Sequence, residues 1–259
     1  ESHVDRSIND PLYFIKNNLN SAINLFYAYC QYYKKKKIKL FHISTDEVYG
    51  SITKGESREN DAYEPSSPYS ASKGGADLIA SSFNKTYGVE IKILNLSNNY
   101  GPYQFPEKFI PTLISHFLKN KKAPIYGNGK NIREWMHVED SCNAIWKSII
   151  SKEKFKKMNL GSGVRVSNID IALNIFEIMK TKNLTNLKKD NFLKMVKDRP
   201  GHDERYALNT KFFKKKIKYK IKKNLKEGLK ETISWYIEND KWIKNVNKSY
   251  NFRRLGLID

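Results

Sequence analysis

The sequence predicts an α/β protein built on a parallel sheet. Short apolar runs that are typical of strands, at 38–43 and 91–96, alternate with longer stretches of helical periodicity, at 11–33 and 69–87. The first apolar run ends abruptly in a hydroxyl and acidic segment, 44–47. In open α/β sheets, ligands bind in the crevice at the carboxyl ends of the strands. We therefore expect consecutive βα units with a binding site after the first strand.

The elements of the first hundred residues have clear boundary signals. Asp10 and Pro11 provide a helix N-cap and first turn, and apolar residues recur at helical spacing after them. A loop rich in Gly, Ser and Pro, 50–68, separates the first strand from the helix that begins after Pro68. The strand at 91–96 alternates apolar and polar side chains.

The rest of the chain predicts a smaller lobe of mixed helices and strands. Gly and Pro residues punctuate its first loop, and a Gly-Asn-Gly turn lies at 127–129. Ser167 is expected to cap a helix. Helices are expected at 109–118, 140–150, 168–179 and 225–237, and strands or extended segments at 125–126, 132–138, 158–160 and 192–196.

Composition excludes several classes of protein. The chain of 259 residues is long enough for one or two domains, and no apolar run reaches the roughly 18 residues of a membrane span, so no membrane partner is expected. The net charge of +20 comes mostly from short lysine runs without base-stacking motifs, so no nucleic-acid partner is expected. Two cysteines without metal-ligand spacing favour a reducing, cytoplasmic compartment and no metal site.

Two groups of residues suggest proton transfer. Tyr69 and Lys73 stand at i and i+4 on one helical face, and a fixed cation beside a tyrosine lowers its pKa from about 10. Asp46 and Glu47 are adjacent carboxyls whose environments can separate their pKa values into one acid and one base. Alone, the first pattern is more often a solvated helix face and the second a polar turn, but their order around a Pro-Ser-Ser-Pro loop favours a catalytic site.

These motifs resemble those of a known family. Residues 44–50 read Ser-Thr-Asp-Glu-Val-Tyr-Gly and residues 69–73 read Tyr-Ser-Ala-Ser-Lys. The pattern is similar to the extended short-chain dehydrogenase/reductases, specifically the dTDP-glucose 4,6-dehydratases. The likeness covers nearly the whole chain, through further motifs at 1–7, 97–102, 105–108, 124–127 and 198–203.

The resemblance implies a Rossmann-like parallel sheet and a smaller mixed α/β substrate lobe. Residues 1–100 would form the C-terminal part of an NAD-binding domain, and residues 101–259 would mostly bind a nucleotide sugar, with some segments returning to the first domain. No Gly-x-x-Gly-x-x-Gly or Gly-x-Gly-x-x-Gly occurs in the chain, although such a fold holds the cofactor's pyrophosphate with that loop. We therefore expect a chain that lacks its N-terminal units and has little or no activity by itself.

The implied chemistry is an NAD-dependent dehydration that converts dTDP-glucose to dTDP-4-keto-6-deoxyglucose, in a homodimer. Tyr69 would take the proton of the 4-hydroxyl while hydride leaves to NAD, and Lys73 would lower the Tyr69 pKa and hold the nicotinamide ribose. Thr45 would hydrogen-bond the same sugar oxygen. Glu47 would remove the proton of carbon 5, and Asp46 would protonate the departing 6-hydroxyl.

Binding residues are carried over by position in the matching motifs. Asn99 corresponds to a cofactor contact, together with Tyr69 and Lys73. The nucleotide-sugar contacts, in addition to Thr45, would be Ser2, Asn98, Lys108, Phe109, Pro124, Ile125, Tyr126, Arg133, Asn168, Asp198, Arg199, Pro200, Gly201 and His202.

Several of these residues have an ordinary structural alternative. The planar forks of Arg133 and Arg199 suit a diphosphate. From the residues alone, Arg133 is about equally well explained by an ion pair. Its candidate partners are Glu134, Glu139 and Asp140. His202 could likewise be a buried structural histidine. The aromatic residues expected simply to contribute packing are Trp135, Trp235 and Trp242.

Two other functions stay open at this point. A related NAD-dependent epimerase or dehydratase for a UDP- or GDP-sugar would share Tyr69 and Lys73, because these enzymes also begin by oxidising carbon 4. The Asp46–Glu47 pair favours elimination, since only elimination needs both an acid and a base there. The absent phosphate loop suggests instead an inactive fragment or a basic binding protein.

Overall fold

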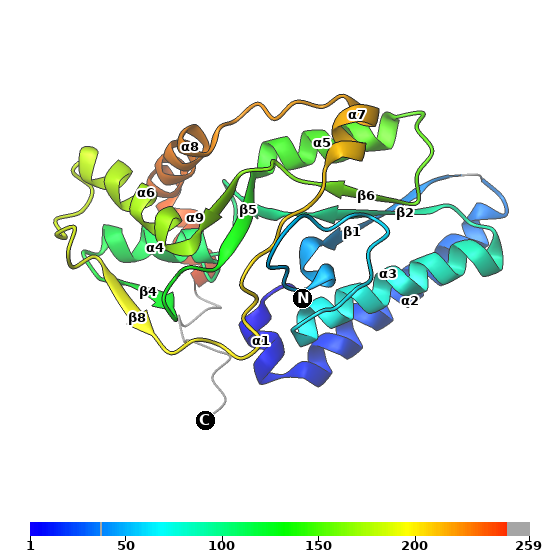
Figure 1. Ribbon diagram of the computed structural model, residues 1–259, viewed down its shortest axis with the longest axis horizontal. Helices are drawn as coiled ribbons and strands as arrows, with labels where there is room; N and C mark the ends of the chain where they lie inside the picture. Colours follow the sequence, from blue (N-terminus) through cyan, green and yellow to red (C-terminus); the bar gives the residue numbers. More distant parts are fainter. Residues whose placement is uncertain (37, 248–259) are drawn as a thin grey trace.

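The computed structural model describes residues 1–36 and 38–247, and it confirms the predicted α/β fold class with a parallel sheet. A three-stranded sheet runs through the larger part of the molecule in the order β1-β2-β6 (Figure 1). Both strand pairs are parallel, and the register places Thr45 opposite Leu96. The strands are β1 (Leu40–Thr45), β2 (Ile91–Leu96) and β6 (Lys157–Leu160).

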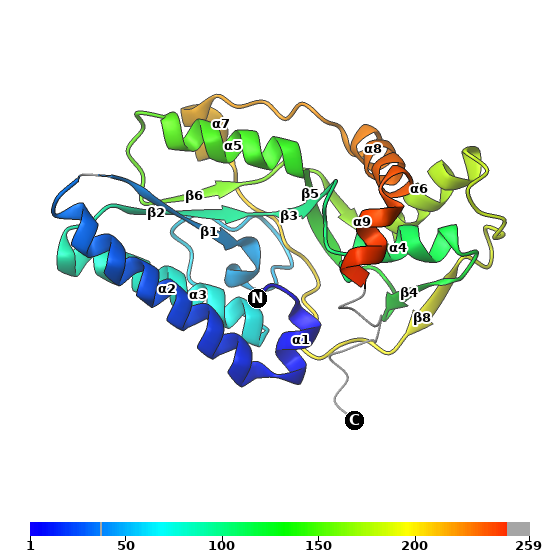
Figure 2. The same cartoon turned by 180° about the vertical axis from the view of Figure 1, so that it is seen from behind.

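Helices cover both faces of this sheet. On one face lie α2 (Pro11–Tyr33) and α3 (Pro68–Tyr87), and on the other lie α5 (Val138–Ile150) and α7 (Lys211–Ile217), as Figure 1 shows and Figure 2 repeats from behind. Each face buries its own apolar cluster against the strands. Parallel strands are normally covered on both sides, because their crossover connections place helices there.

Because helices cover both faces of the sheet, the polar residues of β2 are buried and need partners. All six of its residues are buried, although the sequence alternates apolar and polar types. Lys92 places its ammonium 4.4 Å from the ring centroid of Phe155, and the Asn95 amide donates hydrogen bonds within the core. A buried polar group costs free energy unless it finds such partners.

The smaller part surrounds a separate core. Two more sheets lie here, in the orders β3-β5-β7 and β4-β8. Phe117 and Phe176 are among its fully buried side chains. Its strands are β3 (Asn98–Tyr100), β4 (Ala123–Tyr126), β5 (Ile132–His137), β7 (Arg165–Ser167) and β8 (Leu193–Val196). Its helices are α4 (Phe109–Leu118), α6 (Asn168–Thr181), α8 (Leu225–Glu238) and α9 (Asp240–Asn247).

Boundary signals located the long elements well. The helices expected at 11–33 and 109–118 have these bounds in the structure. The first strand runs two residues later than expected, over 40–45, so Thr45 belongs to the strand. The elements that were not expected have three to eight residues, too few for a recognisable period: α1 (Val4–Asn9), the 3-10 helix η1 (Asp46–Tyr49), β3, β7, α7 and α9.

A buried ion cluster joins the loop after β1 to the smaller part. Glu134 on β5 is fully buried and accepts hydrogen bonds from the backbone N–H groups of Gly163 (2.9 Å) and Leu208 (3.2 Å). Arg165 donates to Glu134 at 3.1 Å and to Glu56 at 2.7 Å. A buried carboxylate needs this many partners, because loss of one leaves an uncompensated charge.

This cluster predicts a large effect at Gly161. A Cβ there would lie 2.0 Å from Glu134 Oε1, so Gly161→Ala must displace the carboxylate from its donors. We expect a loss of about 3 kcal/mol in the free energy of unfolding, measured by urea denaturation. Gly74→Ala, inside α3, is the control, because its Cβ would make an ordinary 3.4 Å contact with the Tyr63 ring. Equal stability of the two variants would contradict the role given to Glu134.

Candidate active site

The carboxyl end of β1 presents a hydroxyl and two carboxyls in succession. β1 ends at Thr45, and the chain turns directly into the 3-10 helix η1 (Asp46–Tyr49). The Thr45 hydroxyl accepts from the backbone N–H of Glu47 at 3.3 Å and donates to Asp46 Oδ1 at 3.2 Å. Asp46 is 3% exposed, so its carboxyl lies inside the protein at the edge of the sheet where ligands are expected.

The first turn of α3 lies beside this strand end. Ser67 and Ser70 form a reciprocal capping box that starts the helix. The backbone N–H of Tyr69 donates to Ser7 Oγ of α1 at 3.1 Å. The buried Tyr69 phenol lies near the Thr45 hydroxyl, which opposes the rise of the Tyr69 pKa. The structure therefore brings the predicted base and the predicted strand-end residues together.

The electrostatics of Tyr69 differ from the sequence expectation. Burial raises its pKa, and the nearby Glu47 carboxyl raises it further. Lys73 was expected to lower the Tyr69 pKa, but its Nζ donates to the carbonyl oxygen of Ile43 at 2.7 Å. Burial lowers the pKa of Lys73 itself. The phenol resists ionisation here because a buried anion would face carboxyls, while the ammonium is held by a strand carbonyl.

The two adjacent carboxyls have different surroundings. Burial raises the pKa of Asp46 well above its usual range, and the neighbouring Glu47 and Glu134 raise it further. Burial also raises the pKa of Glu47, but Arg199 and Arg133 oppose this effect. Asp46 thus favours the protonated form more strongly than Glu47 does. Such a difference can give one acid and one base.

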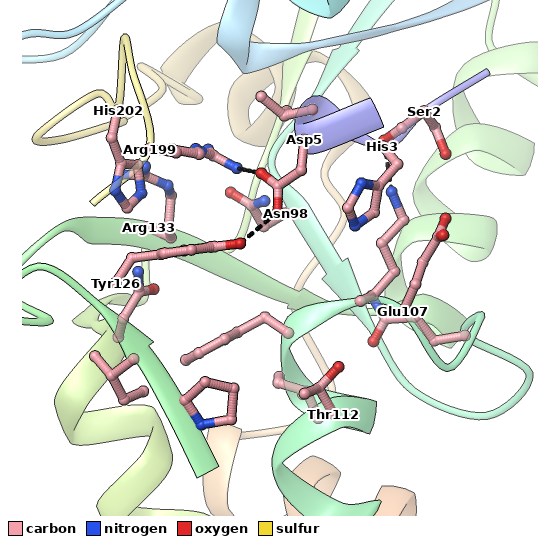
Figure 3. A pocket seen from close by; sticks show the side chains of 18 of the residues that line it. Ser2, His3, Asp5, Asn98, Glu107, Thr112, Tyr126, Arg133, Arg199 and His202 are labelled. Atoms are coloured by element: carbon pink, nitrogen blue, oxygen red, sulfur yellow. Dashed lines mark hydrogen bonds and ion pairs between the residues drawn. The ribbon is translucent and has the colours of Figure 1, made fainter. Parts of the chain in front are cut away.

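A cavity of ≈ 340 Å³ opens next to Glu47 between α1, α4 and the 198–202 segment. Figure 3 shows the side chains that point into it. Most of the predicted binding residues line this cavity: Ser2, Asn98, Asn99, Lys108, Phe109, Pro124, Ile125, Tyr126, Arg133, Asn168, Arg199 and His202. Glu47 lines it too, whereas Thr45, Asp46, Tyr69 and Lys73 are not part of its lining.

Arg133 is free to serve this cavity. It donates to the carbonyl oxygens of Ile132 (2.9 Å) and Asp203 (2.8 Å), and its guanidinium lies 4.2 Å from the ring centroid of Tyr206. Within the described residues, no ion pair joins it to the three carboxylates considered from sequence. The ion-pair alternative for Arg133 is therefore wrong, and two backbone carbonyls and the Tyr206 ring hold its guanidinium at the cavity.

Asp5 holds two predicted binding residues in place, although sequence reasoning missed it. Its carboxylate accepts from Tyr126 at 2.6 Å and from Arg199 at 3.0 Å, as the dashed lines in Figure 3 show. Asp5 lies inside the 1–7 motif, which was the available signal. The other lining residues that were missed are His3, Val4, Gln104, Glu107, Ile110, Thr112, His116, Trp135, Val196 and Tyr206.

The tryptophans expected to contribute packing do so. Trp135 packs in the core of the smaller part and also lines the cavity. Trp235 contacts Trp242 at a ring-centroid distance of 5.1 Å. Packing and lining are therefore compatible roles for one large side chain.

The 198–202 segment divides between the cavity and the surface. Asp198, Pro200 and Gly201 are exposed and do not line the cavity. Asp198 Oδ1 lies 2.6 Å from His202 Nδ1 and so orients the imidazole. Burial and the nearby arginines lower the pKa of His202 to about 4. His202 is thus a neutral lining residue near pH 7.

The same segment is attached to the start of α3. Gly201 has a φ of +62°, and a Cβ at this position would lie 2.5 Å from the carbonyl oxygen of Ser66. The Ser66 hydroxyl donates to Asp203 Oδ1 at 2.5 Å. Glycine is required by both the backbone conformation and this close approach.

Several buried polar atoms around the cavity have no hydrogen-bond partner within the described structure. They include Asn98 Oδ1, Asn99 Oδ1, Gln104 Oε1 and Arg199 Nε. Buried polar groups are normally paired, so unpaired ones beside a cavity suit a polar ligand. In residues 1–36 and 38–247 there is no cluster of side chains suited to a metal ion, and no helix long and apolar enough to cross a membrane.

Comparison with known proteins agrees with this site. A family model described as GDP-mannose 4,6 dehydratase matches residues 1–232. A probable dTDP-glucose 4,6-dehydratase of Sinorhizobium fredii is 39% identical over 100% of this chain and 76% of its own length. The dTDP-glucose 4,6-dehydratase 1 of Escherichia coli is 37% identical over 95% of this chain and 73% of its own length.

Solved structures give the same result. DesIV, the dTDP-glucose 4,6-dehydratase of Streptomyces venezuelae solved with NAD bound, has a TM-score of 0.86 and 35% identity, and the match covers 95% of this chain and 73% of that one. A UDP-N-acetylglucosamine 4-epimerase of Methanobrevibacter ruminantium has a TM-score of 0.79 but only 26% identity, over 91% of this chain and 74% of that one. The chain therefore belongs to the dTDP-glucose 4,6-dehydratase family of extended short-chain dehydrogenase/reductases.

Proposed function

We propose that the protein converts dTDP-glucose to dTDP-4-keto-6-deoxyglucose with NAD. The observation that carries this proposal is the placement of the buried Asp46 and the cavity-lining Glu47 at the end of β1, close to Tyr69. The surroundings of the two carboxyls raise their pKa values to different degrees. Oxidation and reduction at carbon 4 need only a tyrosine base. Loss of water across carbons 5 and 6 also needs a proton acceptor and a proton donor, and these two carboxyls can supply both.

Bound NAD would supply reversible hydride transfer to and from the sugar. Tyr69, Lys73 and Asn99 suit the nicotinamide end. Asn99 Oδ1 is buried with no partner among the described residues, and Lys73 Nζ needs only to turn from a carbonyl oxygen. The sequence contains no glycine-rich phosphate loop, so this fit concerns the nicotinamide end alone.

The cavity suits the nucleotide sugar. Arg133, Arg199 and Lys108 line the cavity and give it the positive charge that a diphosphate needs. Phe109 and Ile125 offer apolar surface to a base, and Ser2, Asn98 and Asn168 offer polar atoms to the sugar or the nucleoside. Glu47 is the link between this cavity and the strand-end residues.

Proton transfers would follow from the positions of the side chains. Tyr69 takes the proton of the 4-hydroxyl, and the Thr45 hydroxyl holds the same oxygen. Glu47 takes the proton of carbon 5, which the 4-keto group has made acidic. Asp46 gives its proton to the 6-hydroxyl, which leaves as water. Glu47 would then return its proton to carbon 5 as carbon 6 regains the hydride that carbon 4 gave up, which completes the 4-keto-6-deoxy sugar. Lys73 keeps its positive charge beside the developing phenolate.

We also propose that different parts of the chain bind the cofactor and the substrate. Residues 1–100 contribute to the NAD-binding domain, and residues 101–259 mostly bind the nucleotide sugar. Some segments after residue 100 return to the first domain. Support for this comes from β6 and α5, which lie late in the sequence but pack with β2 around the larger sheet. We propose that the protein is cytoplasmic, because Cys30 and Cys142 are both free thiols.

A homodimer fits the outer face of α2. Leu12, Ile23 and Tyr27 are exposed there, and their spacing places them on one side of the helix. An apolar stripe of this kind, accompanied by the exposed Leu78 on α3, is suited to a second copy of the chain.

The first prediction concerns the product. A form of the protein that also carries a glycine-rich phosphate loop should convert dTDP-glucose, in the presence of NAD, to the 4-keto-6-deoxy sugar, identified by nuclear magnetic resonance. Residues 1–259 alone should show little or no turnover. UDP-glucose and GDP-glucose serve as comparison substrates, and calorimetry measures binding of dTDP-glucose separately from turnover. Formation of the 4-epimer alone would favour the epimerase function and overturn the proposal.

The second prediction is a bell-shaped dependence of dehydration on pH. Elimination needs ionised Glu47, so the rate falls as pH drops through its raised pKa, above the usual range of glutamate. It also needs protonated Asp46, so the rate falls as pH rises through the raised pKa of that group. The apparent pKa values of both limbs belong to the coupled Asp46–Glu47 pair, not to either residue alone.

Substitution separates the two half-reactions. Glu47→Gln and Asp46→Asn should block elimination, while 4-oxidation, followed by absorbance of reduced nicotinamide, continues. Equal loss of both half-reactions would give the carboxyls a structural role only.

The third prediction concerns the dimer. Tyr27→Lys places a charge in the apolar stripe and should shift the protein toward monomer in sedimentation equilibrium. Tyr32→Lys is the matched control, because Tyr32 is equally exposed (63% against 62%) but lies about 140° around the same helix. If both variants behave like the unmodified protein, the stripe is not the dimer contact.

A further inference from the structure

A buried carboxylate on α3 has no part in the proposed chemistry. Asp77 is 1% exposed, and its Oδ2 accepts hydrogen bonds from Ser44 (2.7 Å), Tyr63 (2.9 Å) and Asn95 (3.2 Å). Its Oδ1 lies 3.2 Å from His42 Nε2. Among the described residues no lysine or arginine forms an ion pair with it. Burying such a group is costly, so its position calls for an explanation.

Asp77 and Lys73, on successive turns of α3, contact the same short stretch of β1. Lys73 Nζ donates to the carbonyl oxygen of Ile43. Asp77, four residues later on the same helical face, contacts His42 and Ser44, the residues on either side of Ile43. These contacts fix both the distance and the axial position of α3 relative to the strand.

A third contact links Asp77 to the end of β1 that carries the candidate catalytic residues. Asn95 lies opposite Ser44 in the register of β1 and β2. Its amide donates both to Asp77 Oδ2 and to the carbonyl oxygen of Thr45, each at 3.2 Å. Asp77 is thus linked through one side chain to Thr45, whose hydroxyl lies near the Tyr69 phenol.

The charge of Asp77 acts on the same two residues. It raises the pKa of Lys73, against the lowering caused by burial. It is also among the groups that raise the pKa of Tyr69. The other charged or titratable groups around it are His42 on β1, Tyr49 on η1, Tyr63 in the loop before α3, and Lys157 on β6. The Lys157 ammonium lies 4.2 Å from the Tyr63 ring centroid.

We propose that Asp77 is a positioning residue that holds Tyr69 and Lys73 of α3 in register with the Thr45 end of β1. This role rests on the proposed function. It acts through other side chains, since Asp77 does not line the cavity. Small displacements matter here, because a misplacement of about 1 Å can cost on the order of a hundredfold in rate.

The test compares two ways of changing Asp77 in the form of the protein that carries a glycine-rich phosphate loop. Asp77→Ala removes the acceptor and the charge, and should lower kcat by roughly 10- to 100-fold while the Kd for dTDP-glucose changes by less than about threefold. Asp77→Asn keeps an acceptor oxygen and should regain most of kcat. Because the pKa values of Lys73 and Tyr69 both lose the raising effect of Asp77, the pH profile of 4-oxidation should move to lower pH in Asp77→Asn.

Asp140→Ala and Asp140→Asn are the matched controls. Asp140 is also 1% exposed and accepts from Tyr219 and from the backbone N–H groups of Lys222 and Lys223, but it lies on α5. These variants should lower the melting temperature without moving the pH profile. If Asp140→Ala loses as much kcat as Asp77→Ala, or if kcat and Kd worsen together in Asp77→Ala, the positioning role is overturned.

One readout is independent of turnover. Hydrogen–deuterium exchange of residues 66–73 and 40–47 should speed up in Asp77→Ala and stay unchanged in Asp140→Ala. If the loop-carrying form without these substitutions does not dehydrate dTDP-glucose, the proposed function fails while this exchange still reports whether Asp77 holds α3 on β1. Unchanged exchange in Asp77→Ala would refute the positioning role itself.

Discussion

Buried negative charge is the constraint around which the carboxyl edge of the sheet is built. A carboxylate taken from water costs several kcal/mol unless it is paired or hydrogen-bonded. Glu134 is compensated by Arg165 and two backbone amides, and Asp77 by three donors. Glu47 has cations nearby, and Asp46 is left with a raised pKa. Four carboxyls of the same two residue types therefore have four different chemical characters.

These different compensations also connect the parts of the molecule. The partners of Glu134 come from β7, from the loop before it and from the chain before α7. The cations near Glu47 come from β5 and the 198–202 segment. The charge state of the strand end thus depends on residues of the smaller part. A ligand that occupies the cavity and draws on those arginines would alter the surroundings of Glu47 directly.

Local signals explain how much of this could be predicted from sequence. Asp10 and Pro11 begin a helix whatever lies around them, and the motif residues 44–47 mark the strand end by their change in polarity. The contact between Asp5 and Arg199 joins residues 194 positions apart, and no local pattern encodes it. The Tyr69 pKa was misjudged for a related reason. Spacing on a helix reveals a neighbouring cation, but it does not reveal how deeply the phenol is buried or which carbonyl holds the ammonium.

The close approach of Gly201 to Ser66 restricts how this protein can be altered. The 198–202 segment carries Arg199 and His202 into the cavity, yet its backbone rests on the residue just before the α3 capping box. Exchanging that segment for one from a relative with another substrate would therefore disturb the starting point of the helix that carries Tyr69. A successful graft must move both loops as a unit, and natural divergence of substrate choice in such a chain should proceed by paired changes in the two loops.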